Sequence, residues 1–375
     1  MVEISKVRST LLSLLAMNTP SGREGVEADF LEGELKAIGF TTWRDGAGQT
    51  VGGNTGNVLA RLEGTAPGAT ALLFNAHMDT VAPTDALVVR EEEGVLRSSG
   101  DTILGADDKA GVAAVLEGVR AAVAEGFPRP TIEVVFTIAE ETGLRGAKAL
   151  DYAGLTARQG YAFDGGRPTG GIVVAAPSQN SLRVKVHGVA AHAGGAPEKG
   201  VNAIRVAADA ILRMPLGRID GETTANIGVI EGGKATNIVP DLVTLRGEAR
   251  SRSEEKLERQ TQAMVDAFHQ AAAAAGVSAE VEVARSYTRF VVERDDRVVQ
   301  RAVEAGRRSG IAEPVIRLGG GGSDANIFNA NGIRSVVLGL GYDNPHGVDE
   351  HVPLEDVAIA SQVAVELIRL AGQER

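Results

Sequence analysis

Five short motifs combine acidic residues with histidine, and each of them follows a predicted strand or opens a predicted helix. They are AHMDT (76–80), GADDKAG (105–111), AEETG (139–143), FDGG (163–166) and PHGVDE (345–350). In open α/β sheets, ligands bind at the carboxyl ends of the strands. The chain has no cysteine, so a metal ion would be held by His and carboxylate groups. The motifs therefore indicate a site for divalent metal ions.

The first two motifs also have plainer interpretations. On extended backbone, His77 and Asp79 face the same way, so the carboxylate of Asp79 can hold one ring nitrogen while the other binds metal. Taken alone, the motif equally fits a solvated histidine at a strand end. Asp107 and Asp108 at a helix start can likewise be simple N-terminal caps.

Glu140 and Glu141 are harder to explain as surface residues. They directly follow the apolar run 131–138, which predicts a buried strand. Buried charges cost several kcal/mol unless they are paired or coordinated. One of these acids can be a metal ligand and its neighbour a free base. Asp164 and His346 also follow predicted strands, with His351 as an alternative ligand to His346.

The segments outside the middle of the chain alternate helix and strand. This pattern predicts an α/β fold with a mixed, largely parallel sheet and helices on both faces. We expect helices at 3–17, 23–38, 108–124, 297–309 and 354–370, and strands at 57–62, 71–76, 131–138, 160–163 and 335–338. The first helix is amphipathic, which we favour over a signal peptide.

The middle of the chain follows a different order, β-α-β-β-α-β, as in ferredoxin-like α+β domains. Its expected strands are 182–189, 226–230, 242–249 and 279–283, and its expected helices are 201–212 and 253–275. We therefore predict one domain formed by residues 1–178 and 289–375, with residues 179–288 as a separate inserted domain. The family resemblance described below implies that the first is the catalytic domain and the second a lid or dimerisation domain.

The charge balance restricts the class of partner. The formal net charge of the 375 residues is −11, and no long basic run is present. Nucleic acids and anionic membranes both attract clustered Lys and Arg, so neither is expected as a partner. No stretch is long and apolar enough to span a bilayer. We expect a cytoplasmic protein that acts on a small molecule.

The ordered set His77-x-Asp79, Asp107-Asp108, Glu140-Glu141, Asp164 and His346 resembles the di-zinc peptidase family of peptidase T, aminoacylase, glutamate carboxypeptidase and acetylornithine deacetylase. The resemblance runs over essentially the whole chain, including the inserted domain. The block LGGGGSDAN (318–326) and the phrase DGG (164–166) are most similar to the peptidase-T-like branch.

This resemblance implies a role for each residue of the set. Asp107 would bridge two metal ions, with His77 and Asp164 completing one site and Glu141 and His346 the other. Two divalent ions per subunit are implied, with zinc favoured by the ligand types and cobalt or manganese as alternatives. The family also has a cis peptide bond after the bridging aspartate.

The catalytic residues implied by the resemblance are Glu140, Asp79 and His192. Glu140 would be the general acid/base and Asp79 would orient His77. His192 would reach the active site of the partner subunit in a homodimer and donate to the developing oxyanion; the alternative is a loop histidine.

Four further residues are implied to contact the substrate: Asn237, Arg250, Gly321 and Ser323. A turn residue and a surface charge are the alternatives for Asn237 and Arg250. The glycine run 319–322 lacks the Lys-Ser/Thr of a phosphate-binding loop, so we interpret it as a flexible loop facing the substrate.

The function implied is metal-dependent hydrolysis of amide bonds in small peptides, with release of the N-terminal residue. A deacylase or carboxypeptidase acting on N-acyl amino acids is the alternative on the same scaffold. A metal-binding protein without catalytic activity is a further alternative, which the presence of Glu140 disfavours. The glycine run departs from peptidase T itself, which leaves specificity for tripeptides open.

Overall fold

The computed structural model describes residues 2–374, which divide into two compact units. The first unit contains the residues up to Ala175, residues 290–319 and the residues from Ser323 onward, and the second contains 176–289 with 320–322. The junctions at 175/176 and 289/290 lie within three residues of the predicted ones at 178/179 and 288/289.

A nine-stranded sheet forms the centre of the first unit, in the order β1-β2-β6-β3-β7-β16-β8-β14, with β15 paired to β8. The pairs β6–β3, β3–β7, β7–β16 and β15–β8 are parallel, and the pairs β1–β2, β2–β6 and β16–β8 are antiparallel. The sheet is therefore mixed and largely parallel at its centre, as predicted. The strands are β1 (Thr41–Arg44), β2 (Val58–Leu62), β3 (Leu72–His77), β6 (Ile132–Thr137), β7 (Gln159–Gly165), β8 (Ile172–Ala176), β14 (Phe290–Val291), β15 (Ile316–Leu318) and β16 (Arg334–Gly339).

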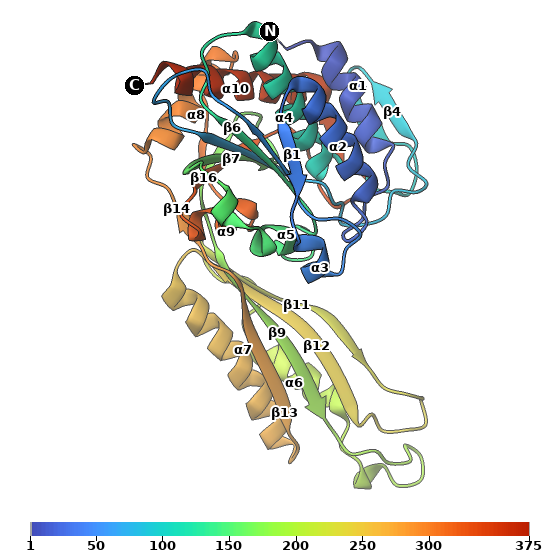
Figure 1. Ribbon diagram of the computed structural model, residues 1–375. Helices are drawn as coiled ribbons and strands as arrows, with labels where there is room; N and C mark the ends of the chain where they lie inside the picture. Colours follow the sequence, from blue (N-terminus) through green and yellow to red (C-terminus); the bar gives the residue numbers. More distant parts are fainter. Residues whose placement is uncertain (1, 375) are drawn as a thin grey trace. The chain divides into compact units, whose positions relative to one another are not determined.

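Helices cover both faces of this sheet (Figure 1). One face carries α4 (Ala106–Glu125) and α10 (Leu354–Gln373), which pack on each other, with α1 (Ile4–Leu15), α2 (Gly25–Ile38) and α8 (Arg297–Arg308) beside them. The other face carries the short helices α5 (Arg145–Ala149) and α9 (Asp324–Ala330). Three further short elements are α3 (Ala47–Val51), η1 (Tyr152–Gly154) and a sheet of β4 (Val89–Glu92), β5 (Val95–Ser98) and β17 (His351–Pro353).

A buried ammonium group ties the N-terminal helices to α4. Lys109 Nζ donates to the carbonyl oxygens of Leu14 and Met17, at 2.8 and 2.7 Å. It also donates to Thr19 Oγ1 and to Glu27 Oε2, each at 3.0 Å. A buried charge is tolerated only when it is paired and hydrogen-bonded, and Lys109 meets both conditions.

The second unit is an antiparallel sheet in the order β10-β11-β12-β9-β13 with two helices. Apart from the two-residue β10, this is the strand order of a ferredoxin-like domain. The elements are β9 (Ser178–His187), η2 (Pro197–Lys199), α6 (Ala203–Arg213), β10 (Gly217–Arg218), β11 (Thr223–Gly232), β12 (Leu242–Ser251), α7 (Glu254–Ala274) and β13 (Ala279–Tyr287). Its core is apolar and includes Val184, Val243 and Phe268.

The elements that the sequence did not predict are short. They are β1, β4, β5, β8, β10, β14, β15 and β17 among the strands and α3, α5 and α9 among the helices. Segments of two to seven residues contain too few positions for a hydrophobic period to be recognised. Within residues 2–374, no helix combines the length and apolar character needed to cross a bilayer.

Candidate metal centre

The sheet order brings the five chemical motifs to one edge. His77 ends β3, Asp164 lies near the end of β7, and Glu140 and Glu141 follow β6. His346 lies in the loop after β16. These four strands are neighbours running in the same direction, so their carboxyl ends meet at one edge of the sheet. Asp107 reaches the same edge from the start of α4, where its backbone is not helical (φ −83°, ψ 101°).

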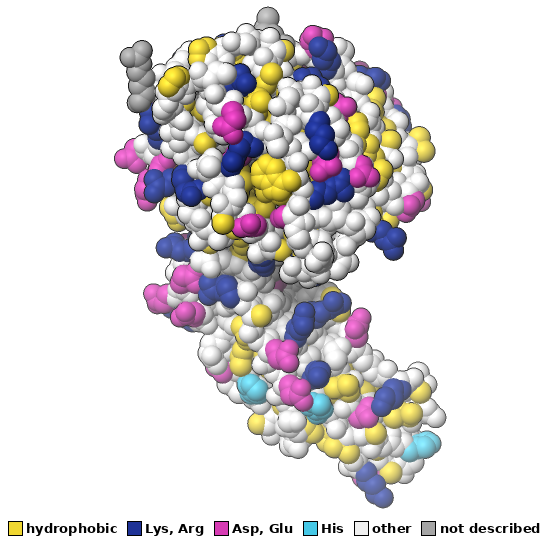
Figure 2. Space-filling model, viewed as in Figure 1, with side chains coloured by type: hydrophobic (Ala, Val, Ile, Leu, Met, Phe, Trp, Pro, Cys, Tyr) yellow, Lys and Arg dark blue, Asp and Glu magenta, His cyan; other side chains and the backbone are white. Residues whose placement is uncertain are grey.

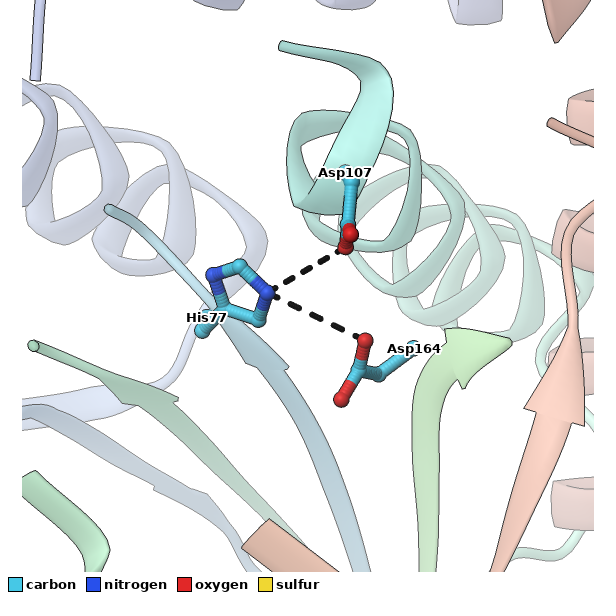
Figure 3. Close-up of side chains that lie close together, drawn as sticks. All are labelled: His77, Asp107 and Asp164. Atoms are coloured by element: carbon cyan, nitrogen blue, oxygen red, sulfur yellow. Dashed lines mark ion pairs between the residues drawn. The ribbon is translucent and has the colours of Figure 1, made fainter. Parts of the chain in front are cut away.

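The first group of candidate ligands contains His77, Asp107 and Asp164. Figure 3 shows the ring of His77 turned toward both carboxylates, with each residue coming from a different element. His77 Nε2 lies 3.3 Å from Asp107 Oδ1 and 3.8 Å from Asp164 Oδ1. One potential ligand atom from each residue lies within 4.8 Å of the others.

The second group contains Asp107, Glu141 and His346. His346 Nε2 lies 2.9 Å from Glu141 Oε1 and 3.3 Å from Asp107 Oδ2. Asp107 therefore offers Oδ1 to the first group and Oδ2 to the second. The structure thus brings together all five predicted ligands, whereas His351 lies in β17 and belongs to neither group.

The chemistry of these donors fits a pair of divalent cations. Each group supplies one imidazole nitrogen and two carboxylate oxygens, which are the ligand types that zinc and related ions accept. Burial opposes ionisation of Asp107, yet its contacts with His346 and His77 lower the pKa of its carboxyl. Contacts with Asp107 and Glu141 raise the pKa of His346 to about 10.

Two carboxyl groups of the centre have raised pKa values. For Asp164, burial and then the nearby charge of Asp107 raise the pKa well above its usual range, against the opposing effect of His77. For Glu140, burial and the charges of Asp164, Asp324 and Glu141 raise the pKa in the same way, again opposed by His77. Glu140 is outside both ligand groups, so it remains available for proton transfer.

Asp79 lies beside His77, as expected. The ring atom Nδ1 of His77 lies 2.9 Å from the backbone oxygen of Asp79 and 3.6 Å from its carboxylate. The carboxylate also accepts the backbone N–H groups of Glu140 and Glu141, at 2.9 and 3.2 Å. Asp79 therefore fixes the ring through its main chain and the two glutamates through its side chain.

Two residues that the sequence analysis did not single out, Ser21 and Glu24, contact the segments that carry the candidate ligands. Ser21 Oγ donates to Asp79 Oδ2 at 2.5 Å. Glu24 Oε1 accepts the N–H of Ala139 at 3.0 Å, and Ala139 has a positive φ of 51°. The segment TPSG (19–22) has the composition of a turn, but nothing in it indicates these partners.

Asp108, which the motif had suggested as a cap, also contacts the ligand segment. Its Oδ2 accepts the backbone N–H of His77 at 3.1 Å. The peptide bond between Asp107 and Asp108 is cis, as the family resemblance implied.

His192, Asn237, Arg250 and Gly321 lie in the second unit, and Ser323 lies in the first. The backbone brings His192 beside Asn237, whose carbonyl oxygen accepts the N–H of Ala193 at 2.9 Å. A Cβ atom on Gly321 would lie 3.6 Å from Arg250 Nη1, so these two residues are also neighbours. Arg250 forms an ion pair with Glu248 at 2.8 Å.

The glycine run is closely packed at one position. A Cβ atom on Gly322 would lie 2.3 Å from the ring of Tyr287, so this position has no room for a side chain. Ser323 caps α9, and its N–H is accepted by Asn326 Oδ1 at 3.1 Å.

Comparison with known proteins shows similarity to peptidases over essentially the whole chain. Residues 73–370 match peptidase family M20/M25/M40. The uncharacterized protein YqjE of Bacillus subtilis is 41% identical over 373 residues, which cover 100% of both chains. The structure of aminopeptidase PepT from Bacillus cereus is 40% identical, with a TM-score of 0.88, and the match covers 99% of this chain and 100% of that one.

A tripeptidase structure from Staphylococcus aureus is 37% identical, with a TM-score of 0.93 and full coverage of both chains. The family match, the identity to these relatives and the clustered ligand groups agree with one another. The chain therefore belongs to peptidase family M20/M25/M40, and it is a metal-dependent peptide hydrolase.

Proposed function

We propose that this protein is an aminopeptidase that uses two divalent metal ions to release the N-terminal residue of short peptides. The observation that carries the proposal is the position of Asp107, which presents one carboxylate oxygen to each of two His-carboxylate groups. The similarity to the aminopeptidase and the tripeptidase supports peptides as substrates.

His77, Asp107 and Asp164 would hold one ion, and Asp107, Glu141 and His346 the other. The three carboxylates bring three negative charges against the four positive charges of two divalent ions, and an ionised Glu140 makes the balance neutral. Zinc suits this mixture of imidazole and carboxylate, with cobalt and manganese as alternatives. When bound, the ions supply Lewis acidity, which polarises the scissile carbonyl and lowers the pKa of water.

Glu140 would move the proton. Its carboxylate takes a proton from the attacking water and delivers it to the leaving nitrogen, so that the carbon–nitrogen bond breaks as an amine forms. Its raised pKa supports this role, because a general acid must hold its proton until the leaving group needs it. The carboxylate of Asp79 accepts the backbone N–H of Glu140 and would keep Glu140 in place.

The substrate's two ends would be bound by groups of opposite charge. An acid-rich edge can bind the α-ammonium group, while Arg250, with Asn237, Gly321 and Ser323, would hold the carboxylate. The fork of an arginine matches the two oxygens of a carboxylate. The proximity of Gly321 to Arg250 supports a common subsite for these two residues.

We also propose that the second unit is a lid and dimerisation domain, and that His192 serves the partner subunit in a homodimer. His192 Nδ1 accepts the N–H groups of Gly194 and Gly195, at 3.1 and 3.0 Å. An Nδ1 that accepts leaves the ring proton on Nε2 in the neutral form. This supports His192 as a hydrogen-bond donor to an oxyanion. A cytoplasmic location stays a prediction from the sequence.

The test compares alanine peptides with free and blocked ends. Purified protein loaded with zinc is given Ala-Ala-Ala, its N-acetyl form, its C-terminal amide and N-acetyl-Ala, and products are identified by mass spectrometry. We expect free alanine from Ala-Ala-Ala and a large loss of kcat/KM when either end is blocked, because buried polar partners are then left unpaired. Preference for N-acetyl-Ala would contradict the aminopeptidase proposal and favour the deacylase.

A further inference from the structure

Two residues outside the ligand groups contact Asp107 from the segment after β16. Tyr342 Oη donates to Asp107 Oδ1 at 3.2 Å. Glu350 Oε1 accepts the backbone N–H of Asp107 at 2.9 Å, and its Oε2 accepts the N–H of Gly105 at 2.7 Å. Both side chains are buried, Tyr342 being 3% exposed and Glu350 1%. The nine-residue segment 342–350 thus contacts both the side chain and the backbone of Asp107.

Asp107 depends on such contacts because the regular helix does not fix it. Its φ and ψ are not helical, and Gly105 before it is left-handed, with φ +77°. The carboxylate must nevertheless point its two oxygens in different directions. The hydrogen bond from Tyr342 to Oδ1 fixes the rotation of the Asp107 carboxylate. The two hydrogen bonds that Glu350 accepts fix the backbone at Gly105 and Asp107.

The start of segment 342–350 is itself held in a defined conformation. Gly341 has φ +86°, and a Cβ atom there would lie 2.5 Å from both Asp356 Cβ and Thr169 Oγ1. The next residue, Tyr342, accepts the N–H of Arg167 at its carbonyl oxygen, at 3.2 Å. His346 lies between Tyr342 and Glu350, so the contacts of these two residues also set the position of His346 relative to Asp107.

We propose that Tyr342 and Glu350 are positioning residues that orient Asp107 as the shared ligand of two metal ions. The inference rests on the proposed two-metal function, but neither residue is itself a ligand. Partners that hold a metal ligand in place commonly change metal affinity or activity about 10–100-fold when they are removed. Because Tyr342 contacts Oδ1, its removal should affect mainly the site shared with His77 and Asp164.

The first test uses Tyr342→Phe, which keeps the ring and removes only the hydroxyl. Tyr152→Phe is the matched control, because Tyr152 donates to a backbone carbonyl, that of Ala147, and has no contact with a ligand residue. Metal-free protein is titrated with Co²⁺ in competition with a chromophoric chelator, and the visible absorption of the bound cobalt is recorded. We expect Tyr342→Phe to bind cobalt about 10–100-fold more weakly with an altered absorption band, and Tyr152→Phe to match the wild type.

The second test uses Glu350→Gln, in which the amide NH₂ must face one of the two backbone N–H groups. Glu133→Gln is its control, since Glu133 is also buried and accepts the backbone N–H groups of Thr156 and Ala157. Thermal unfolding of the metal-free proteins measures any general loss of stability. We expect both glutamine variants to lose stability, but only Glu350→Gln to lose cobalt affinity.

Two outcomes would separate the failure of this inference from that of the proposed function. Wild-type protein that takes up two cobalt ions while Tyr342→Phe and Glu350→Gln show unchanged affinity and absorption would overturn the inference alone. Wild-type protein that takes up no cobalt would overturn the two-metal function and, with it, the role of Asp107 that these residues are proposed to support.

Discussion

The two units differ in where they keep their charged side chains. Among the described residues, every buried Asp, Glu, Lys, Arg or His belongs to the first unit. Several of them, such as Glu24, Asp79, Asp108 and Glu350, accept backbone N–H groups of the segments that form the metal centre.

The second unit buries apolar and neutral polar side chains and leaves its charges at the surface. Its ion pairs are exposed, for example Lys256 with Asp220 and Glu222. On the face seen in Figure 2, acidic and basic side chains are interspersed. Exposed pairs of this kind contribute only about 0–1 kcal/mol each.

This difference indicates that the first unit contains the functional site. Buried carboxylates cost stability unless they are hydrogen-bonded or paired, and groups with perturbed pKa values cluster at functional sites. The first unit tolerates such groups because they hold the candidate ligands in place. The second unit has a core that packing alone explains, so its contribution to catalysis would come from residues at its surface, such as the exposed His192 and the half-buried Arg250.

The largest effect should come from the proposed acid/base of the first unit. Glu140→Gln keeps the shape of the side chain but cannot take a proton from water, so kcat should fall by about 10²–10⁴-fold. Metal content, measured by elemental analysis, should stay near that of the wild type. Glu141→Gln is the control and should lose metal as well as activity. Near-normal turnover by Glu140→Gln would show that another group transfers the proton.

A smaller loss is expected from the proposed donor of the second unit. His192→Ala should lower kcat about 10²–10³-fold, as does removal of one oxyanion donor in other hydrolases. Mixing inactive Glu140→Gln chains with inactive His192→Ala chains should restore activity if the two residues of one site come from different subunits. Absence of recovery, after subunit exchange has been demonstrated, would contradict service to the partner.

Removal of metal should loosen the first unit selectively. An ion present at 100 times its dissociation constant stabilises the folded state by about 2.7 kcal/mol, which corresponds to about 100-fold less opening. In hydrogen-exchange mass spectrometry, chelation should speed exchange at the ends of β3 and β6 and the start of α4. The strands β9 and β12 of the second unit should be unaffected, and equal acceleration in both units would contradict a centre confined to the first.

A further predicted effect is a dependence of metal affinity on pH. Contacts with Asp107 and Glu141 raise the pKa of His346 from 6.5 to about 10, so its ring holds a proton that metal must displace. The same applies to Asp164, whose pKa is raised by burial. Affinity should therefore rise with pH, by about tenfold per pH unit for each proton released.

Chelator competition at pH 6, 7 and 8 measures this dependence, and a pH-stat measures the protons released. In metal-free protein the sign is opposite for stability. The stabilising contribution of protonated His346 is complete below pH 6.5 and is lost as the pH rises through about 10. An affinity that does not change with pH would show that the ligands carry no protons before metal binds.

The sequence predicted that the five motifs lie close together, because each stands near the end of a strand or at the start of a helix that the hydrophobic pattern reveals, and the family resemblance then implied which residue of each motif is a ligand. Parallel strands bring such ends together, so the proximity of His77, Glu141 and Asp164 could be predicted without knowing any distance. The order of the second unit could be predicted for a related reason, since its strands and helices are long and regular.

The supporting contacts could not be predicted in this way. Glu24 meets Ala139 across 115 positions of sequence, and Tyr342 meets Asp107 across 235. Such pairings depend on how whole elements pack, which no local period encodes. The contacts of Asp79 show the same limit: spacing placed its carboxylate beside His77, where it lies 3.6 Å from Nδ1, but did not reveal that it also accepts the N–H groups of Glu140 and Glu141.

The position of β16 in the sheet has a consequence for biosynthesis. This strand comes from residues 334–339 but lies between β7 and β8, and His346 follows it in a chain of 375 residues. Chains emerge from the ribosome N-terminus first, so the sheet stays open between β7 and β8 until residues 334–339 have been made. A nascent or prematurely terminated chain therefore lacks both a central strand and one arm of the metal centre. Both candidate ligand groups are therefore present together only after residue 346 has joined the chain.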